Sequence, residues 1–398
     1  MKYYLGTIAL FLVVALSFSP RVAAQVGVGD LDGRVNTVFT AIPFLRINPD
    51  TRTGAMGDVG IATDVDASAL YHNVAKLAYA PSNAGLTVNY TPWLKELVSD
   101  IFIAQLAGYV KLDDLQSIGL SARYFSLGNI NFTDITGQDI GSFSPNEFAI
   151  DLGYARKLST NFSTGITLKY VRSDLASGQD IGAGNIVNAA QAVAADLGFF
   201  YRNPDLTIGG KSAELSLGAA ITNIGNKVSY TQDDTKDFIP TNLGIGSNLK
   251  FELDEHNTLA VAVDINKLMV PTPDSSFNNN PTDPENPRNK PLISGMFGSF
   301  GDAPGGFSEE MQELMYSIGL EYWYNKQFAV RAGYFNEHRL KGNRKFLTVG
   351  VGLRYSVFGL NFSYIVPTTS QRNPLDNTLR FALTFDFNGD GSAKEILE

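Results

Sequence analysis

The stretch LTVGVGLRY, residues 347 to 355, decides the fold class because its side chains alternate strictly between two kinds. One kind is apolar or aromatic: Leu347, Val349, Val351, Leu353 and Tyr355. The other kind is small or charged: Thr348, Gly350, Gly352 and Arg354. Successive side chains of a strand point to opposite faces, so this pattern predicts a strand with one wholly apolar face.

The same alternation recurs about fourteen times from residue 84 onward, without a helical interruption of any size. The predicted strands are 84–92, 101–111, 115–128, 143–158, 161–174, 190–202, 211–223, 238–253, 255–269, 312–325, 327–337, 343–356, 358–367 and 378–388. Other clear examples of the alternation begin at Phe148 and at Leu259. Aromatic residues tend to close these runs, as they do where a lipid-facing strand meets the headgroups.

The connections between these strands alternate between short and long. Tight turns are predicted near 112–114, 159–160, 254–255, 325–326 and 356–357, with a medium turn near 203–210. Long links are predicted at 129–142, 175–189, 224–237, 270–311 and 368–377, with shorter ones at 93–100 and 338–342. Outer-membrane barrels place short turns in the periplasm and long loops outside. We therefore predict an all-β, transmembrane, antiparallel β-barrel of about fourteen strands rather than a large soluble β-protein.

The first residues predict a secretory signal peptide. Lys2 precedes an apolar run from Leu5 to Phe18, and small residues end at Ala24. A membrane anchor helix is the alternative, but the run is short for a span of about 20 residues. The predicted parts are a signal peptide at 1–24, a segment at 25–83, a barrel at 84–388 and a periplasmic tail at 389–398, with both ends of the mature chain in the periplasm. The chain has no cysteine, which excludes a lipoprotein and disulfides.

Composition and motifs disfavour nucleic-acid binding and catalysis. The net charge is −9 and no basic cluster is present, which argues against a nucleic-acid partner. The three histidines, His72, His256 and His338, are too dispersed to form a metal site or a triad. The segment that ends at Ser212 partly matches a phosphate-binding loop, and the segment that begins at Asp386 partly matches a calcium-binding loop. Each segment has the wrong residue at a position that its motif requires. We predict no metal, no cofactor and no enzymatic activity.

The inward faces of the predicted strands carry a balanced set of charges. They are Arg123, Lys169, Arg331, Arg354 and Arg380, and Asp151, Asp196, Glu214, Asp264 and Glu321. A water-filled pore is compatible with this set, and so is a lumen whose charges pair with one another or with a plug. Residues 25–83 lack barrel periodicity and contain many apolar side chains, so we predict that they fold inside the barrel as a hatch. The alternative is a loose periplasmic extension.

The long link at 270–311 is the predicted contact surface for a partner. Its second half contains more apolar side chains than a loop that merely faces water needs. The candidates are Leu292, Ile293, Met296, Phe297, Phe300 and Phe307. These side chains insert into a partner or fold back over the barrel mouth, and the sequence does not separate the two. Residues 308–316 are predicted to form a short helix with Ser308 as its N-cap.

Two stretches resemble a known family. IPFLRINPDTRTGAMGDVG at 42–60, continuing to YHNVAK at 71–76, is similar to the N-terminal region of the PorV family of the type IX secretion system. SGMFGSFGDAPGGFSEE at 294–310 resembles a loop of the same family. The residues that carry the hatch motif are Pro49, Asp50, Gly54, Gly57, Asp58 and Asn73. This chain has Asn73-Val74-Ala75 where the family usually has Asn-Pro-Ala, which puts the local turn in question.

The resemblance implies a FadL-like barrel and a role in secretion without catalysis. PorV-like proteins bind the C-terminal signal domains of cargo that leaves the SprA translocon. They deliver this cargo to an attachment complex containing the sortase-like PorU, which couples it to surface lipopolysaccharide. The implied partners are therefore SprA, PorU, cargo signal domains and the lipid of the outer membrane. The alternative function is a FadL-like transporter of hydrophobic small molecules.

Overall fold

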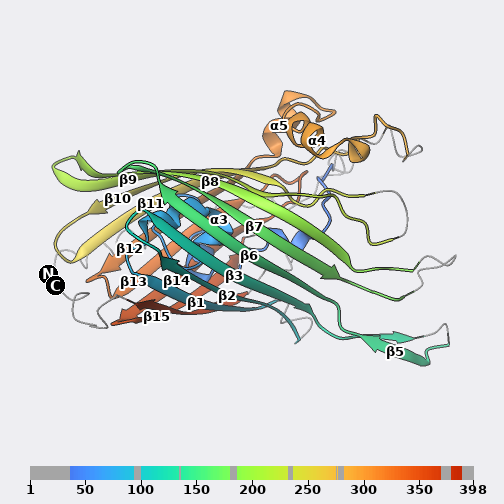
Figure 1. Cartoon of the computed structure of the whole chain (residues 1–398), viewed down its shortest axis with the longest axis horizontal. Coiled ribbons are helices and arrows are strands. Elements are labelled where there is room, and N and C mark those ends of the chain that lie inside the picture. Colours follow the sequence, from blue (N-terminus) through green and yellow to red (C-terminus); the bar gives the residue numbers. More distant parts are fainter. Residues whose placement is uncertain are drawn as a thin grey trace.

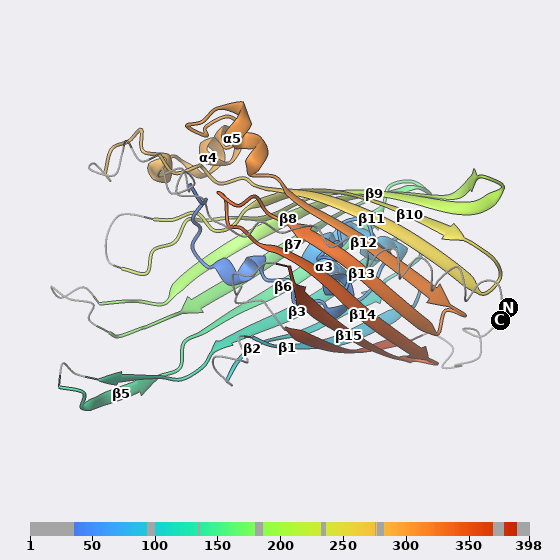
Figure 2. The same ribbon diagram turned by 180° about the vertical axis from the view of Figure 1, so that it is seen from behind.

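The computed structural model describes residues 36–93, 100–133, 136–179, 186–231, 236–274, 276, 282–368 and 378–387. It is a closed barrel of fourteen strands (Figures 1 and 2). The barrel strands are β1 Ala84–Pro92, β2 Ile101–Lys111, β3 Gln116–Leu127, β6 Asn146–Lys157, β7 Phe162–Asp174, β8 Ala190–Ile208, β9 Lys211–Gly225, β10 Asn242–Glu252, β11 Asn257–Leu268, β12 Met315–Tyr324, β13 Phe328–Asn336, β14 Lys345–Tyr355, β15 Phe358–Pro367 and β16 Leu379–Phe387.

The wall closes through the first and last strands. β1 pairs with β16 from Ala84 opposite Phe387 to Tyr90 opposite Phe381, and β1 pairs with β2 on its other edge. All pairs are antiparallel, as in β14, where Val349 faces Tyr364 of β15. Closure satisfies the backbone groups of both terminal strands, which hydrocarbon requires because it offers no hydrogen-bond partners. The prediction of an antiparallel barrel of about fourteen strands is confirmed.

The connections divide the barrel into two ends. We call the end with the short connections the turn end and the opposite end the loop end. One prediction at the turn end was wrong: the link at 203–210 is a two-residue turn at Gly209 and Gly210, with φ of 60° and 77°. β8 continues through Pro204 because β7 no longer pairs with it there, so the missing proline N–H costs no ladder bond.

A second difference lies at the loop end. The predicted link at 129–142 contains a separate two-stranded sheet, formed by β4 Ile130–Thr133 and β5 Asp139–Phe143. This hairpin projects beyond the wall (Figure 1). Its strands are only four and five residues long, so the search for alternation of barrel-strand length did not find them.

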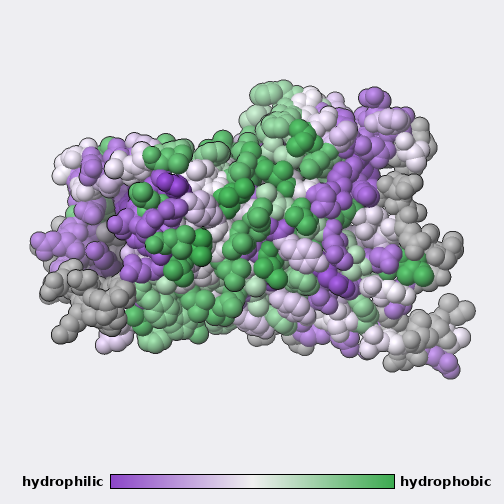
Figure 3. All heavy atoms as spheres, viewed as in Figure 1, coloured by the Kyte–Doolittle hydropathy of each residue, from purple (hydrophilic) through white to green (hydrophobic). Residues whose placement is uncertain are grey.

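The outer face of the wall is apolar, as the sequence pattern predicted. Leu120, Leu152, Leu168, Val193 and Leu383 are all exposed on it. Hydrophobic side chains gather over the middle of the wall, and hydrophilic ones gather toward the ends (Figure 3). Lipid-facing strands of outer-membrane barrels show this arrangement.

The segment before β1 runs through the lumen from one end to the other. Asn36 donates its backbone N–H to Leu340 O at the loop end, whereas Ala84 begins β1 at the turn end. Between them lie η2 Pro43–Arg46, α2 Thr51–Gly54, α3 Ala69–His72 and η3 Val74–Tyr79. Figure 1 shows this segment within the barrel. We call residues 36–83 the hatch segment.

The link between β11 and β12 carries two short helices on the outside of the barrel. They are α4 Leu292–Gly298 and α5 Phe307–Gln312, preceded by the turn η5 Pro287–Asn289. The predicted helix at 308–316 was wrong in its limits. Gly306 is the N-cap residue, with a left-handed φ of 68° that favours glycine, and Met315 already belongs to β12. No helix of the described residues is long and apolar enough to cross a membrane.

Three predictions fall outside the described residues. They are the signal peptide at 1–24, the tail at 389–398 and the periplasmic position of the two ends of the mature chain. The first described residue, Asn36, lies at the loop end, and the last, Phe387, lies at the turn end.

Candidate functional site

The hatch motif folds around a capped turn of helix. Asp50 is the N-cap of α2, and its carboxylate accepts hydrogen bonds from the backbone N–H groups of Arg52 and Thr53. It also accepts a hydrogen bond from the Thr53 hydroxyl. Pro49 is buried directly before it. An acceptor side chain at this position satisfies N–H groups that have no partner within the helix.

The turn after α2 brings hatch backbone against the wall. Gly57 and Asp58 have φ of 70° and 64°, and the Gly57 N–H donates to Thr348 Oγ1 of β14. Asp58 Oδ1 accepts from Asn48 Nδ2 and from Arg380 Nη1 of β16. The turn therefore ties the hatch to two strands of the wall.

Asn73 performs its structural role without the family's proline. Its side-chain oxygen accepts from Ala75 N, which caps η3. Its side-chain amide donates to Ile61 O of the hatch and to Phe199 O of β8. Val74 occupies the first helical position, where proline is favoured but not required. The turn that the sequence put in question is therefore formed.

The strongest link between hatch and wall is a buried group of three charges. Glu321 of β12 accepts from Arg52 Nη2 of α2 at 2.7 Å and from Arg331 Nε of β13 at 2.7 Å. Glu321 and Arg331 are almost fully buried, and Arg52 is largely buried. A carboxylate between two guanidinium groups compensates charges that would otherwise be costly to bury.

The other predicted lumen charges have partners on the wall or on the hatch. Asp264 accepts from the backbone N–H groups of Gly60 and Ile61 in the hatch, and Arg380 pairs with Asp58. The wall pairs are Arg123 with Asp151, Lys169 with Asp196, and Glu214 with Arg202 and Lys250. Arg354 differs because it lies largely exposed at the turn end, 3.9 Å from Asp386.

Several charged partners were not found by the sequence analysis. Arg46 of η2 and Arg344 both donate to Glu337 at the loop end, at 3.0 and 2.7 Å. Burial alone would raise the pKa of Glu337, but Arg344 and Arg46 hold that pKa below its ordinary value. Arg46 and Arg52 lie in a segment without periodicity, so no pattern marked them as partners of the wall.

The hatch backbone also lies directly on small residues of the wall. A Cβ atom added at Gly333 of β13 would lie 2.0 Å from the carbonyl carbon of Met56 and 2.1 Å from Gly57 N.

We expect Gly333→Ala to lower the free energy of unfolding by about 1–3 kcal/mol, because the wall or hatch backbone must shift. Urea unfolding in detergent measures this change in the free energy of unfolding. Gly298→Ala, which meets no atom within 4 Å, is the matched control. Equal unfolding midpoints for the two variants would contradict the close contact.

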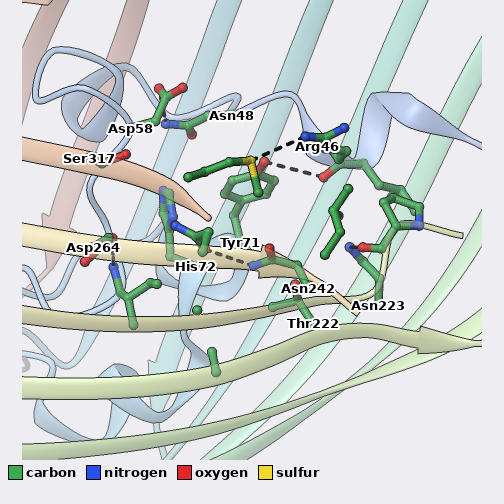
Figure 4. A pocket seen from close by; sticks show the side chains of 18 of the residues that line it. Arg46, Asn48, Asp58, Tyr71, His72, Thr222, Asn223, Asn242, Asp264 and Ser317 are labelled. Carbon is green, nitrogen blue, oxygen red and sulfur yellow. Dashed lines mark hydrogen bonds between the residues drawn. The ribbon is translucent and has the colours of Figure 1, made fainter. Parts of the chain in front are cut away.

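A small cavity with both polar and apolar lining residues lies between the hatch and the wall on the side facing the loop end. Its volume is about 120 Å³. Figure 4 shows the labelled side chains around it: Arg46, Asn48, Asp58, Tyr71 and His72 from the hatch, and Thr222, Asn223, Asn242, Asp264 and Ser317 from the wall. Pockets for small organic ligands usually have about 300–1,000 Å³ and mostly apolar walls. This cavity suits water or a very small polar solute.

A larger groove of about 670 Å³ opens at the loop end. It lies between the start of the hatch segment and the loops before β10 and after β11. Its apolar walls include Phe39, Leu175, Tyr230, Phe238 and Val270. Phe39 is 77% exposed although it is a large apolar residue. The groove is of a size that fits a small ligand or the side chains of a peptide.

The loop residues predicted to meet a partner divide into two groups. Met296 is buried, 3% exposed, and Leu292 packs against the cluster that contains Phe238 and Met315. The remaining candidates are exposed, together with Met311. We call these exposed side chains the loop patch: Ile293, Phe297, Phe300, Phe307 and Met311.

The described residues contain no group of three or more His, Asp or Glu side chains that could hold a metal ion. His72 lies in the hatch, where its Nε2 is 3.0 Å from Thr53 Oγ1. His256 lies in a turn-end connection and His338 in a loop-end connection. The three histidines therefore have no common site.

The family follows from comparison with known sequences. A family model described as "Type IX secretion system protein PorV" matches residues 31–275, which include the hatch segment and the strands from β1 to β11. The chain belongs to the PorV family. It is therefore an outer-membrane β-barrel protein of the type IX secretion system, and this PorV-family chain has a secretion role rather than an enzymatic one. No curated protein matches its sequence.

Solved structures similar to this PorV-family chain include two toluene transporters and a FadL homologue. The toluene transporter TodX of Pseudomonas putida has a TM-score of 0.48 and 14% identity, over 84% of this chain and 98% of its own. The toluene transporter TbuX of Ralstonia pickettii has a TM-score of 0.45 and 12% identity, over 86% and 98%. A FadL homologue of Pseudomonas aeruginosa has a TM-score of 0.45 and 12% identity, over 88% and 100%.

Proposed function

We propose that this protein is a non-enzymatic shuttle and docking protein of the type IX secretion system. It binds the C-terminal signal domain of cargo that leaves the SprA translocon and delivers this cargo to the attachment complex containing PorU. The observation that carries the proposal is the match to the PorV family over residues 31–275. In this role the loop end faces outside the cell, as the short and long connections favour.

The filled lumen supports a role at the surface rather than a conduit. The Glu321 group, the Asp58–Arg380 pair and the Asp264 contacts hold the hatch to several strands at once. The cavity beside the hatch has a volume of only about 120 Å³ and many polar lining residues. An apolar solute would lose favourable burial and would leave polar groups without partners in such a cavity.

The loop patch is the proposed contact for protein partners. Its aromatic side chains are exposed, with Phe307 at 80% and Phe297 at 64%. Aromatic side chains dominate the energetics of protein interfaces when a partner buries them. Leu292 and Met296 support the patch from below, so their proposed role is to position it rather than to touch the partner.

A FadL-like transporter is the second candidate, and one observation favours it. The groove at the loop end has an apolar lining and the volume of a small-ligand site. A transported solute would then have to pass the hatch, which requires the hatch to move. The shuttle function requires no such movement, because the cargo stays at the surface.

A pull-down from the native outer membrane tests the two candidates. The tagged protein is extracted in a gentle detergent and its partners and ligands are identified by mass spectrometry, with another tagged barrel of the same membrane as control. We expect secreted proteins that share a C-terminal signal domain, together with a very large barrel or a sortase-like protein. Recovery of the barrel alone with a bound fatty acid or another apolar ligand would refute the shuttle and favour the transporter.

A further inference from the structure

The helices α4 and α5 present an apolar face that the rest of the described chain does not cover. Ile293 and Phe297 are one helical turn apart on α4, and Phe307 and Met311 are one turn apart on α5. All four side chains are exposed. On the opposite side, Met296 and Gly295 of α4 are buried. On both short helices an apolar stripe is therefore directed away from the barrel, and on α5 the opposite side is charged.

Buried ion pairs fix the direction of this face. Glu310 and Glu313 at the end of α5 both pair with Lys267 of β11. Lys341, in the connection between β13 and β14, pairs with Glu309 and Glu313. All these groups are largely buried, so turning the helices over would leave charges without partners at high cost. The loop patch therefore stays on the outside.

The helices lie beside the wall and not across the barrel opening. Figures 1 and 2 both show α4 and α5 outside the outline of the barrel, above strands of the wall. The short connection from α5 to β12 fixes the height of the helices along the barrel axis. α5 ends at Gln312, β12 begins at Met315, and Tyr316, the next residue, already points outward and is exposed. Three or four residues of extended chain span only about 10–14 Å.

The loop patch is continuous with the lipid-facing surface of the wall. Tyr316, Ile318 and Leu320 follow one another on the outer face of β12 below α5. Figure 3 shows hydrophobic side chains on the helices above the hydrophobic middle of the wall. Aromatic side chains such as Tyr316 mark the level at which a barrel wall meets the headgroups. The patch thus lies at the border between headgroups and acyl chains.

We propose that α4 and α5 lie in the membrane surface at the loop end, with the loop patch inserted between the lipid chains. The occupant of the patch is the leaflet that surrounds the barrel, which is the outer leaflet in the proposed orientation. Helices that bury one apolar face about 5–10 Å into the boundary between headgroups and acyl chains bind lipid in this way. The contact is a property of the chain alone, so it holds whether or not the cargo-binding role is correct. A protein partner of the patch, as proposed above, must therefore be a membrane protein that displaces these lipids when it binds.

Single-cysteine labelling tests this placement, because the chain has no cysteine of its own. Ile293→Cys and Phe297→Cys are labelled with a nitroxide and placed in phosphatidylcholine nanodiscs without any partner protein. The measurement is the ratio of collision with oxygen, which dissolves in lipid, to collision with a water-soluble nickel chelate. Leu320→Cys on the wall is the lipid control. Glu285→Cys, an exposed position in the same link, is the water control.

We expect the oxygen-to-nickel ratios of Ile293→Cys and Phe297→Cys to be several-fold above that of Glu285→Cys and close to that of Leu320→Cys. Ratios equal to that of Glu285→Cys would overturn the proposal and leave the patch as a water-exposed surface for a protein partner. Heat-modified mobility on a gel checks that each variant is a folded barrel. Because both test positions are exposed, a label at either one replaces no buried contact.

Discussion

Replacing Glu321 by alanine is expected to lower the free energy of unfolding by about 3–5 kcal/mol and to loosen the hatch. Glu321 lies between Arg52 of the hatch and Arg331 of the wall, with both contacts at 2.7 Å. Without this carboxylate the two guanidinium groups remain buried and repel each other. Arg52 retains Asp66 and Arg331 retains Asn361, so the loss is large but the barrel still forms.

Urea unfolding in detergent measures the stability, and conductance in planar bilayers measures the loosening of the hatch. Glu214→Ala is the matched control. It removes the same carboxylate from another inward position, but its partners Arg202 and Lys250 are partly exposed and can regain water. We expect the control to unfold close to the native protein and to remain closed. An unchanged unfolding midpoint and no conductance for Glu321→Ala would show that this group does not hold the hatch.

The barrel was predictable from the sequence because every residue of a wall strand faces one of two environments. The side chains from Leu347 to Tyr355 face lipid and lumen in turn. The type of each residue therefore depends on its local environment and not on contacts with residues far away in the sequence. The predicted strand limits therefore agree closely with those of most wall strands. They fail at β8, which continues to Ile208 although a turn was predicted near 203–210. Pro204 is accommodated there because β7 no longer pairs with β8 and the register with β9 shifts between Asn203 and Leu206.

The pairing between hatch and wall was not predictable in the same way. Arg52 and Glu321 are 269 residues apart, and their contact depends on the path of a segment that has no periodicity. The sequence identified Glu321 as an inward charge and predicted a hatch inside the barrel, but it did not indicate which hatch residue meets Glu321. Only the position of α2 against β12 joins the two residues.

The link between β11 and β12 was only partly predictable from the sequence. Its apolar content was readable from the sequence, but the direction of each side chain was not. Met296 and Phe297 are adjacent, yet one is buried and the other is exposed, because α4 places them on different faces of the helix. Identifying the exposed face required the anchoring contacts of Phe238, against which Gly295 packs closely.

The double variant Phe297→Ala with Phe307→Ala is expected to reduce recovery of type IX partners at least about tenfold, since loss of one hot-spot residue typically costs about 2 kcal/mol or more. The two side chains are the most exposed aromatic groups of the loop patch, so their truncation leaves no cavity in the protein. The measurement is the amount of cargo and partner protein recovered per folded barrel from the native outer membrane.

The matched control is Phe328→Ala with Phe358→Ala, which removes two exposed phenylalanines from the wall near the turn end. It deletes the same atoms from the same chemical class of residue, far from the loop patch. Partner recovery with the control should equal that of the native protein, because the control leaves the loop patch intact. A general effect of lost lipid contact would instead lower recovery for both double variants. If both double variants recover partners equally well, α4 and α5 do not form the contact, and the groove beside Phe39 becomes the surface to test.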